Sequence, residues 1–302
     1  MIIYSADGPA PASVGALSQI VFYRAQVKEG QITVNEKRMR QVVALKTQNP
    51  SLKVLVNLEG LEGWKAAQTV FSSPEALIRF AVQVKTTLAD LEVDGVEIYW
   101  LSLDGPTPYT SDMRDHLTQL VTTLRKVLGP QKMIIVFAPG ASPLLQSAAD
   151  WMAIAPWINR VTLTMCGGSP WFSHTVLHNN ALFSESGQPA SVDLDSYVFK
   201  DAAGLFLSCK PGYMLGQINA TQSPFPEYWD SVACMPYRYS AQKKVFFTYE
   251  NARSLALKAT YVKDKGLAGL SVLAIYGDPG GLMDTLARSF RQSPPPPPPT
   301  AK

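Results

Sequence analysis

Short apolar, β-branched runs alternate along the chain with amphipathic stretches, and this alternation is typical of a parallel sheet covered by helices. Many of the runs, such as Met133–Phe137, are apolar without strict alternation, as expected for strands that are buried on both faces. Eight runs predict strands: Met1–Ser5, Gln19–Gln26, Leu52–Leu58, Val93–Leu101, Lys132–Pro139, Ile158–Cys166, Gly212–Ile218 and Gly266–Ile275.

The stretches between these runs carry the periodicity and the end signals of helices. Pro74 and Pro143 occupy first-turn positions, and Gly266 follows the last helix as a C-cap residue. The predicted helices are Asn35–Gln48, Pro74–Asp90, Ser111–Leu128, Pro143–Ala155, Asp193–Leu207 and Ala252–Lys265. Eight strands with helices between them, in about 290 residues, indicate a single-domain (β/α)8 barrel. A doubly wound open sheet is the alternative, but no Gly-x-Gly-x-x-Gly follows the first strand.

The end of the chain differs from the rest, because six consecutive prolines run from Pro294 to Pro299. Proline has no amide donor, so this segment adopts polyproline II and stays outside a packed core. It is either a stiff spacer or a ligand for an aromatic-lined groove of a protein partner. We therefore divide the chain into a barrel at residues 1–291 and a proline-rich tail at residues 292–302.

The composition excludes several classes of protein. With 46% hydrophobic and 17% charged residues the chain is globular, and a net charge of +3 favours no charged partner. The densest basic patch, Lys37–Arg40, is typical of a solvated helix face, so we expect no nucleic-acid partner. No apolar run reaches the roughly 18 residues of a membrane span, and the start lacks a secretory pattern. We expect a protein that is cytoplasmic or exported by an unconventional route.

Cysteine and histidine residues predict neither a metal site nor a cofactor. Cys166, Cys209 and Cys234 lack the C-x-x-C spacing of zinc and redox sites. A disulfide between Cys209 and Cys234 remains open beside the alternative of buried free thiols. The three histidines, His116, His174 and His178, are scattered without ligand-like neighbours.

Four segments, in the same order along the chain, resemble motifs of the chitinase-like family-18 glycoside hydrolases. Lys53–Gly60 is similar to the family's K-V-L-L-S-I-G-G, and Asp94–Leu101 resembles its D-G-x-D-x-D-W-E. Met165–Trp171 is in register with Y-D-F-H-G-P-W, and Phe247–Lys258 with Gly266–Gly269 resembles Y-D-D-x-x-S…K…G-L-G-G. The resemblance implies a (β/α)8 barrel, here without the large insertion domain of some members.

The resemblance also implies chemistry that this chain has lost. In the family the substrate's N-acetyl carbonyl attacks the anomeric carbon, so the protein supplies a general acid and a carboxylate that orients the acetamido group. Leu101 stands at the position of the acid and Tyr99 at that of the orienting aspartate. Met165 and Cys166 replace a tyrosine–aspartate pair, and Leu273 replaces a tryptophan. Leucine has no proton to donate, so we expect no catalytic residue at these degenerate positions.

Some carboxylates remain near the predicted strand ends. Glu97 replaces the deepest carboxylate of the signature and lies about 13 Å along the strand from the missing acid, so we interpret it as a hydrogen-bonded core residue. Glu59, Asp104, Glu250 and Asp278 follow strands or precede the last helix. A pair of them would support a different two-carboxylate hydrolysis, whereas surface or loop-capping roles are the alternative.

Aromatic residues near the predicted barrel mouth suggest a sugar-binding cleft. Trp64, Trp171 and Tyr237, with Glu59 and Tyr99, are the candidate ligand-binding residues. The sequence thus predicts a catalytically inactive chitinase-like protein that binds an N-acetylglucosamine-containing glycan or a protein partner. Two alternatives stay open: an active glycoside hydrolase with relocated carboxylates, and a pure protein-interaction scaffold acting through its surface or its proline tail.

Overall fold

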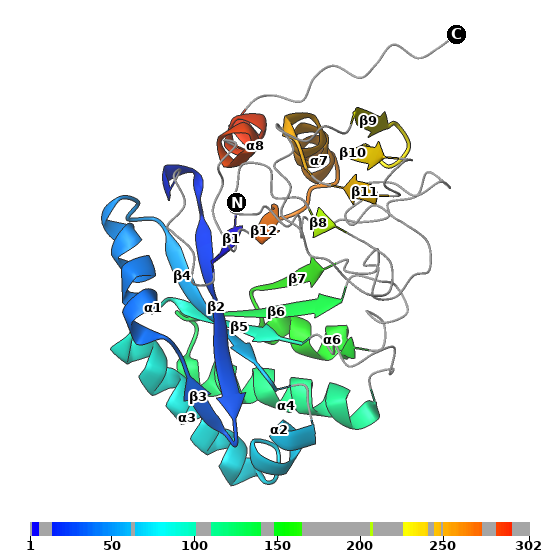
Figure 1. Ribbon diagram of the computed structural model, residues 1–302. Coiled ribbons are helices and arrows are strands. Elements are labelled where there is room, and N and C mark those ends of the chain that lie inside the picture. The colour runs from blue at the N-terminus through cyan, green and yellow to red at the C-terminus, as the bar shows by residue number, and fades with distance from the viewer. Residues whose placement is uncertain are drawn as a thin grey trace.

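The protein folds around two sheets, a large one built mainly of parallel strands and a small antiparallel one (Figure 1). The computed structural model describes residues 2–5, 14–61, 64–100, 110–139, 148–164, 206–207, 226–240, 245–248, 250–273 and 282–291, and the account below is confined to them.

The strands of the large sheet follow the order of a (β/α)8 barrel. They are β1 (Ile2–Ser5), β2 (Gln19–Lys28), β4 (Lys53–Glu59), β5 (Gly95–Tyr99), β6 (Met133–Pro139), β7 (Arg160–Thr164) and β12 (Ser271–Leu273). Their order is β12-β1-β2-β4-β5-β6-β7 with every neighbour parallel, so the last strand of the chain pairs with the first. A parallel pairing of the last strand with the first is typical of a (β/α)8 barrel. The predicted strand Gly212–Ile218 lies outside the described residues. A short strand, β3 (Gln31–Thr33), forms an antiparallel hairpin with β2.

Helices cover the outer face of this sheet, and α1, α3 and α4 lie together along one side of it in Figure 1. The helices are α1 (Glu36–Val43), α2 (Trp64–Thr69), α3 (Pro74–Asp90), α4 (Ser111–Leu128), α6 (Trp151–Ile154), α7 (Ala252–Asp264) and α8 (Leu282–Arg291), with 3₁₀ turns at Val14–Ala16 (η1), Ala44–Thr47 (η2) and Ala155–Trp157 (η3). The bounds of α3 and α4 equal the predicted ones because each begins at a side-chain cap, Ser73 and Thr110 respectively. Neither α2 nor α8 is among the helices predicted from the sequence.

Hydrophobic side chains pack on both sides of the parallel strands. The larger cluster fills the space between the sheet and the helices, and it includes Ile20, Val54 and Phe80. A second cluster on the opposite, inner face consists of Val21, Leu55, Tyr99, Ile135 and Phe137. Successive residues of a strand point to opposite faces, which explains why neighbours such as Val54 and Leu55 belong to different clusters.

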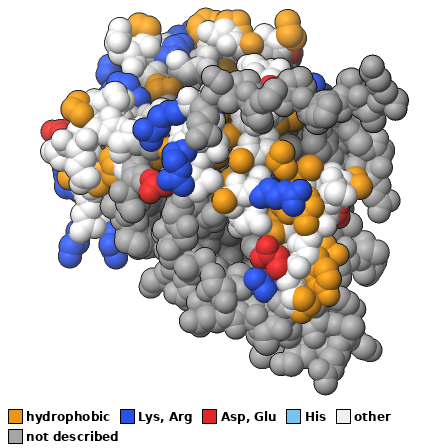
Figure 2. Space-filling model, turned by 90° about the horizontal axis from the view of Figure 1, so that it is seen from above, with side chains coloured by type: hydrophobic (Ala, Val, Ile, Leu, Met, Phe, Trp, Pro, Cys, Tyr) orange, Lys and Arg blue, Asp and Glu red, His pale blue; other side chains and the backbone are white. Residues whose placement is uncertain are grey.

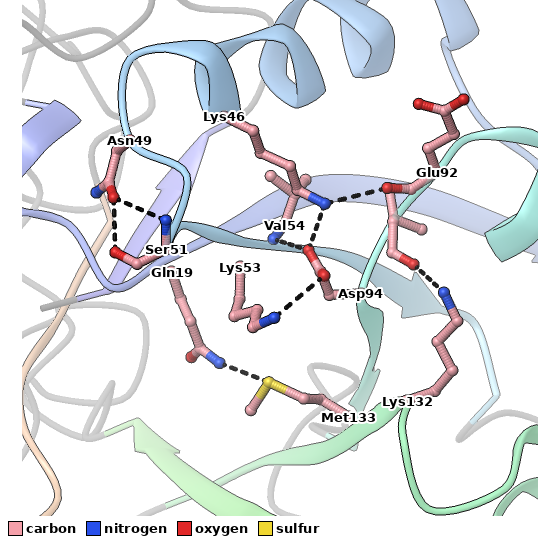
Figure 3. A network of polar contacts seen from close by, with 11 residues as sticks. Gln19, Lys46, Asn49, Ser51, Lys53, Val54, Glu92, Asp94, Lys132 and Met133 are labelled. Carbon is pink, nitrogen blue, oxygen red and sulfur yellow. Dashed lines mark hydrogen bonds and ion pairs between the residues drawn. The ribbon is translucent and has the colours of Figure 1, made fainter.

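A network of ionic and hydrogen-bonded contacts fixes the amino ends of β4, β5 and β6 (Figure 3). Asp94 accepts hydrogen bonds from the Val54 backbone N–H at 2.8 Å and from Lys46 Nζ at 2.7 Å, and Lys53 Nζ lies 3.6 Å away. Lys132 Nζ donates to the Val93 carbonyl at 2.7 Å. Burial raises the pKa of Asp94, but the hydrogen bond from Lys46 and the other donors outweigh it, so the pKa lies below its usual value. The Asp94 carboxylate therefore stabilises the amino end of the sheet.

The small sheet lies beside α7 (Figure 1) and was not predicted from the sequence. Its antiparallel strands run in the order β8 (Phe206–Leu207), β11 (Val245–Thr248), β10 (Met235–Ser240) and β9 (Glu227–Asp230). The prediction of a helix at Asp193–Leu207 is wrong at its last two residues, which pair with β11. Strands of two to six residues rich in polar and aromatic side chains do not show the continuous apolar runs that mark parallel strands.

The face with α7, α8 and the small sheet presents exposed hydrophobic side chains among Lys and Arg side chains (Figure 2). Tyr228, Val232, Leu257 and Leu267 are between 38% and 47% exposed. Single exposed apolar side chains are common on protein surfaces, so this face by itself indicates no partner. None of the helices in the described ranges is long and apolar enough to cross a membrane.

Candidate functional site

Glu97 lies on the inner face of the barrel with its side chain fully buried. Asn57 on β4 donates a hydrogen bond from Nδ2 to Glu97 Oε2 at 2.9 Å, and Thr162 Oγ1 on β7 lies 3.5 Å from Oε1. Asn57 and Glu97 stand directly opposite each other in the register of β4 and β5. This arrangement holds the carboxylate between strands, as buried polar groups require.

Tyr99 lies one alternation further toward the carboxyl end of β5, and its ring is part of an aromatic layer. The ring stacks on Phe137 of β6 with centroids 5.1 Å apart and an interplanar angle of 11°. Tyr23 of β2 approaches from the other side at 6.0 Å and 58°. Because Tyr99 is 5% and Phe137 7% exposed, these rings occupy the inside of the barrel at this level.

Further polar side chains line the interior toward the amino ends of the strands. Arg160 Nη2 on β7 donates to Gln19 Oε1 on β2 at 2.5 Å, and Gln19 Nε2 lies 3.1 Å from Met133 Sδ. The site residues predicted from the sequence do not include Gln19, Asn57, Arg160 or Thr162. The available signal was that each of them lies at an alternate position of a predicted strand. Which strands bring these side chains together depends on how the strands are arranged in the sheet, and a local pattern does not give this.

Glu59 ends β4 at the carboxyl end of the barrel strands and is half-buried. It is in register with Gln26 of β2, beyond an irregularity between Phe22 and Ala25. Gly60, next in the chain, has a φ of +96°, and a Cβ there would lie 2.8 Å from the Val27 carbonyl oxygen. A glycine is therefore needed where the chain turns away from β4 against β2.

Only some of the predicted ligand-binding residues have side chains within the described part of the structure. Trp64 begins α2, but its side chain is outside the described part, as are Leu101, Met165, Cys166 and Trp171. Tyr237 is on β10 of the small sheet, where its ring stacks on Tyr228 with centroids 5.2 Å apart. Glu59 and Tyr99 remain as the candidates with described side chains on barrel strands. Asp104, Asp278, Leu273 (except for its backbone) and the proline tail also lie outside the described residues.

Glu250, one of the strand-end carboxylates, is part of a buried ion pair at the start of α7. Its Oε1 pairs with Lys258 Nζ, and each side chain is 3% exposed. Its Oε2 accepts a hydrogen bond from Ser254, whose hydroxyl also completes a capping box with Asn251. Glu250 thus fixes the first turns of α7 through both carboxylate oxygens.

Histidine and cysteine side chains of the described part do not suggest a metal site. His116 stacks on Phe71 with ring centroids 4.3 Å apart. Cys234 is a free cysteine in the turn before β10, and burial raises the pKa of its thiol. Within the described ranges, no three His, Cys, Asp or Glu side chains are grouped so that they could hold an ion.

Comparison with known proteins identifies relatives along most of the chain. The model of the family described as "Glycosyl hydrolases family 18" matches residues 4–278. Chitinase A1 of Niallia circulans is 24% identical over 301 residues, which cover 80% of this chain and 42% of that protein. Chitinase B of Serratia marcescens is 23% identical over 364 residues, covering 85% of this chain and 71% of that protein. This chain therefore spans less than half the length of Chitinase A1.

Solved structures share the fold over nearly the whole chain. A family-18 N-acetylglucosaminidase from Paenibacillus barengoltzii superposes with a TM-score of 0.74 at 18% identity, covering 96% of this chain and 99% of that one. YKL-39, solved in the presence of chitooligosaccharides, gives a TM-score of 0.72 at 15% identity, covering 97% of this chain and 100% of that one. Together with the family match, these likenesses confirm the predicted (β/α)8 barrel.

Proposed function

Because this chain belongs to glycosyl hydrolase family 18, we propose that it binds an N-acetylglucosamine-containing glycan without hydrolysing it. The observation that carries the proposal is the packing of Tyr99. At the position where the family resemblance implies an orienting carboxylate, this ring is 5% exposed and stacked on Phe137. A phenol in that place offers no negative charge to an acetamido group or to a developing positive charge.

Glu97 does not replace the missing acid. A general acid must come within hydrogen-bond reach of the glycosidic oxygen. Glu97 is fully buried, its carboxylate is held by Asn57, and the Tyr99 ring is one alternation nearer the carboxyl end of β5. Leu101, the residue at the acid position itself, carries no titratable group. Both features argue against the reaction that family members use.

Glycan binding is supported by the family and by the composition of the barrel's carboxyl end. YKL-39, which shares the fold, was solved in the presence of chitooligosaccharides. In this chain the half-buried residues Tyr23 and Glu59 combine an aromatic ring with a carboxylate there. An apolar ring face together with a few placed polar groups is the usual composition of a small-molecule site.

The absence of hydrolysis is tested with fluorogenic chitobioside and chitotrioside over a range of pH, with Chitinase B of Serratia marcescens as the positive control. We expect no release above the blank. Release that Glu97→Gln or Glu59→Gln abolishes would overturn the proposal and establish a hydrolase with relocated carboxylates. Release that survives both substitutions, in protein from two expression hosts, would also overturn the proposal and would point to other carboxylates such as Asp104 or Asp278.

Binding is tested by calorimetry with chitin oligomers at several temperatures. We expect a binding heat with a negative heat-capacity change, because apolar ring faces are buried on association. No heat with any oligomer would reject glycan binding. In that case, capture of a partner by the full chain, compared with a chain that ends at residue 291, would separate a surface on the barrel from the proline tail.

A further inference from the structure

Polar side chains meet across the interior of the barrel at its amino end. Arg160 Nη2 on β7 donates to Gln19 Oε1 on β2 at 2.5 Å, and Gln19 Nε2 lies 3.1 Å from Met133 Sδ on β6. Each of these residues is the first of its strand. Neither β6 nor β7 is next to β2 in the sheet, so the contacts cross the interior. The three side chains therefore gather inside the barrel at the end opposite to Glu59.

The amide of Gln19 has a strong partner on its oxygen and a weak one on its nitrogen. The residue is 4% exposed. Because a guanidinium only donates hydrogen bonds, Oε1 must face Arg160, and the N–H groups of Nε2 point away from it. Among the described residues, the hydrogen-bond acceptor near Nε2 is the thioether sulfur of Met133, which accepts only weakly. A buried donor with a poor acceptor costs free energy, so an oxygen ligand at this point is favoured.

Positive charge lies on two sides of this amide. Arg160 is on one side, and Lys53 is the register partner of Gln19 on the adjacent strand β4, with the two backbones about 4.8 Å apart. The Lys53 side chain is 54% exposed, and its Nζ lies 3.6 Å from Asp94 (Figure 3). Asp94 is paired more closely with Lys46, at 2.7 Å. The Lys53 ammonium is therefore only loosely held, and the cluster carries an excess of positive charge.

We propose that Gln19, Lys53 and Arg160 form a binding site for a small oxyanion, that is, a carboxylate, sulfate or phosphate group. The oxyanion accepts a hydrogen bond from Gln19 Nε2 and from the Lys53 ammonium, and the Arg160 guanidinium supplies a second positive charge. Hydrogen bonds between cationic donors and oxyanions are about twice as strong as neutral ones. The site lies at the amino ends of β2, β4 and β7, so it is independent of the proposed glycan binding. A bound anion joins these strands and stabilises the barrel.

Thermal unfolding of the full chain in inorganic phosphate, against chloride at equal ionic strength, tests the site. A ligand that binds only the folded chain raises its melting temperature. For a dissociation constant of about 1 mM, about 20 mM phosphate should raise it by about 3 °C. Sulfate and acetate identify the oxyanion: a rise with sulfate but not with acetate assigns a tetrahedral dianion, and a rise with acetate assigns a carboxylate. No rise above chloride with any of the three anions would reject the proposal.

Two lysine variants separate a site from a general salt effect, because phosphate and sulfate also stabilise proteins by exclusion from their surface. Lys53→Met should weaken phosphate binding about tenfold and reduce the rise to about 1 °C. The matched control is Lys85→Met, which removes an exposed lysine of α3 and should keep the full rise.

Equal rises in the two variants would overturn the placement. Should Lys53→Met melt at a lower temperature without any anion, calorimetric titration with phosphate at 15 °C, where the variant is folded, decides. An affinity equal to that of Lys85→Met rejects the site, and a tenfold weaker one supports it.

Discussion

At the scale of single residues, two positions of the motif-like segments are required by packing rather than by chemistry. A Cβ on Gly95 would lie 2.2 Å from the backbone oxygen and 2.7 Å from the backbone nitrogen of Met133 on the neighbouring strand. Glu250 satisfies Lys258 and Ser254 inside the protein. Sequence matches to the family motifs at such positions indicate the fold. We expect them whether or not a member of the family is catalytic.

Gly95→Ala should destabilise the barrel strongly. The added methyl group meets backbone atoms, which no rotamer change relieves, so β5 and β6 must separate. Overpacking of this kind costs about 3 kcal/mol. Chemical denaturation followed by tryptophan fluorescence measures the loss. Gly15→Ala is the matched control, because a Cβ there meets nothing within 4 Å. Equal midpoints for the two variants would contradict the packing argument.

Lys258→Met should lower the free energy of unfolding more than a double variant in which both charged partners are removed. The single change leaves Glu250 buried without its counter-charge, which costs about 3–5 kcal/mol. The double variant Lys258→Met, Glu250→Gln removes the uncompensated charge and should recover most of that loss. Urea unfolding of both variants provides the comparison. A double variant that is less stable than the single one would show that Glu250 has another essential partner.

At the scale of elements, the amino ends of two parallel strands, β4 and β5, depend on one aspartate. Asp94 ties the start of β5 to β4 through the Val54 amide and to the end of η2 through Lys46. Its side chain is 21% exposed, so solvent screens these contacts only in part. The ion pair of Asp94 and Lys46 lies at the end of the barrel opposite to Glu59. We therefore expect its loss to lower the stability of the fold.

The lowered pKa of Asp94 makes stability depend on acidity. A carboxyl group whose pKa is lower in the folded chain stabilises it fully above the unfolded value of about 3.9, and this contribution is lost as the pH falls through the folded value. The wild-type denaturation midpoint should thus fall more steeply than that of Asp94→Asn between about pH 5 and pH 2. Above that range the variant should be the less stable protein. Parallel profiles of the two proteins would exclude Asp94 as the titrating group.

The sequence predicts elements well where their signals are local. Pro74–Asp90 and Ser111–Leu128 are found as predicted because caps and a regular apolar stripe define them. The small sheet escaped prediction because its strands, such as Glu227–Asp230, are short and mixed in polarity. Their pairing with distant strands stabilises them, and a local pattern does not carry that information.

The candidate site is predictable only in part, for a related reason. The motif match located Glu97 and Tyr99 on one strand face, and the structure adds what surrounds them, Asn57, Thr162 and Phe137. Those neighbours come from three other strands, and the register of the sheet decides which of them meet. The register of Gln26 with Glu59 was not predictable either, because the shift between Phe22 and Ala25 is a property of the pairing of β2 with β4.

At the scale of the whole molecule, the inside of the barrel has a polar layer beneath an aromatic one. Asn57 and Thr162 contact the Glu97 carboxylate, and the rings of Tyr23, Tyr99 and Phe137 follow toward the carboxyl end. Tyr99, at a position where the family resemblance implies a carboxylate, thus contributes to the core. Under the proposed function, the absence of the carboxylate and the added packing of the ring are one change, and we expect that a single substitution does not reverse it.

Tyr99→Asp puts this view to the test. The aspartate would replace a buried ring with a smaller, charged group. This group cannot stack on Phe137, and it lies on the same strand face as Glu97, two residues away. Removal of a buried aromatic side chain costs about 3–5 kcal/mol, and the buried charge adds to it. Tyr99→Phe keeps the stacked ring and should cost about 1 kcal/mol or less. Denaturant unfolding gives both values, and the fluorogenic chitobioside assay should detect no hydrolysis in either variant. A Tyr99→Asp protein as stable as the wild type, or one that cleaves the substrate, would mean that the barrel keeps an open chemical site at this level and would contradict this view.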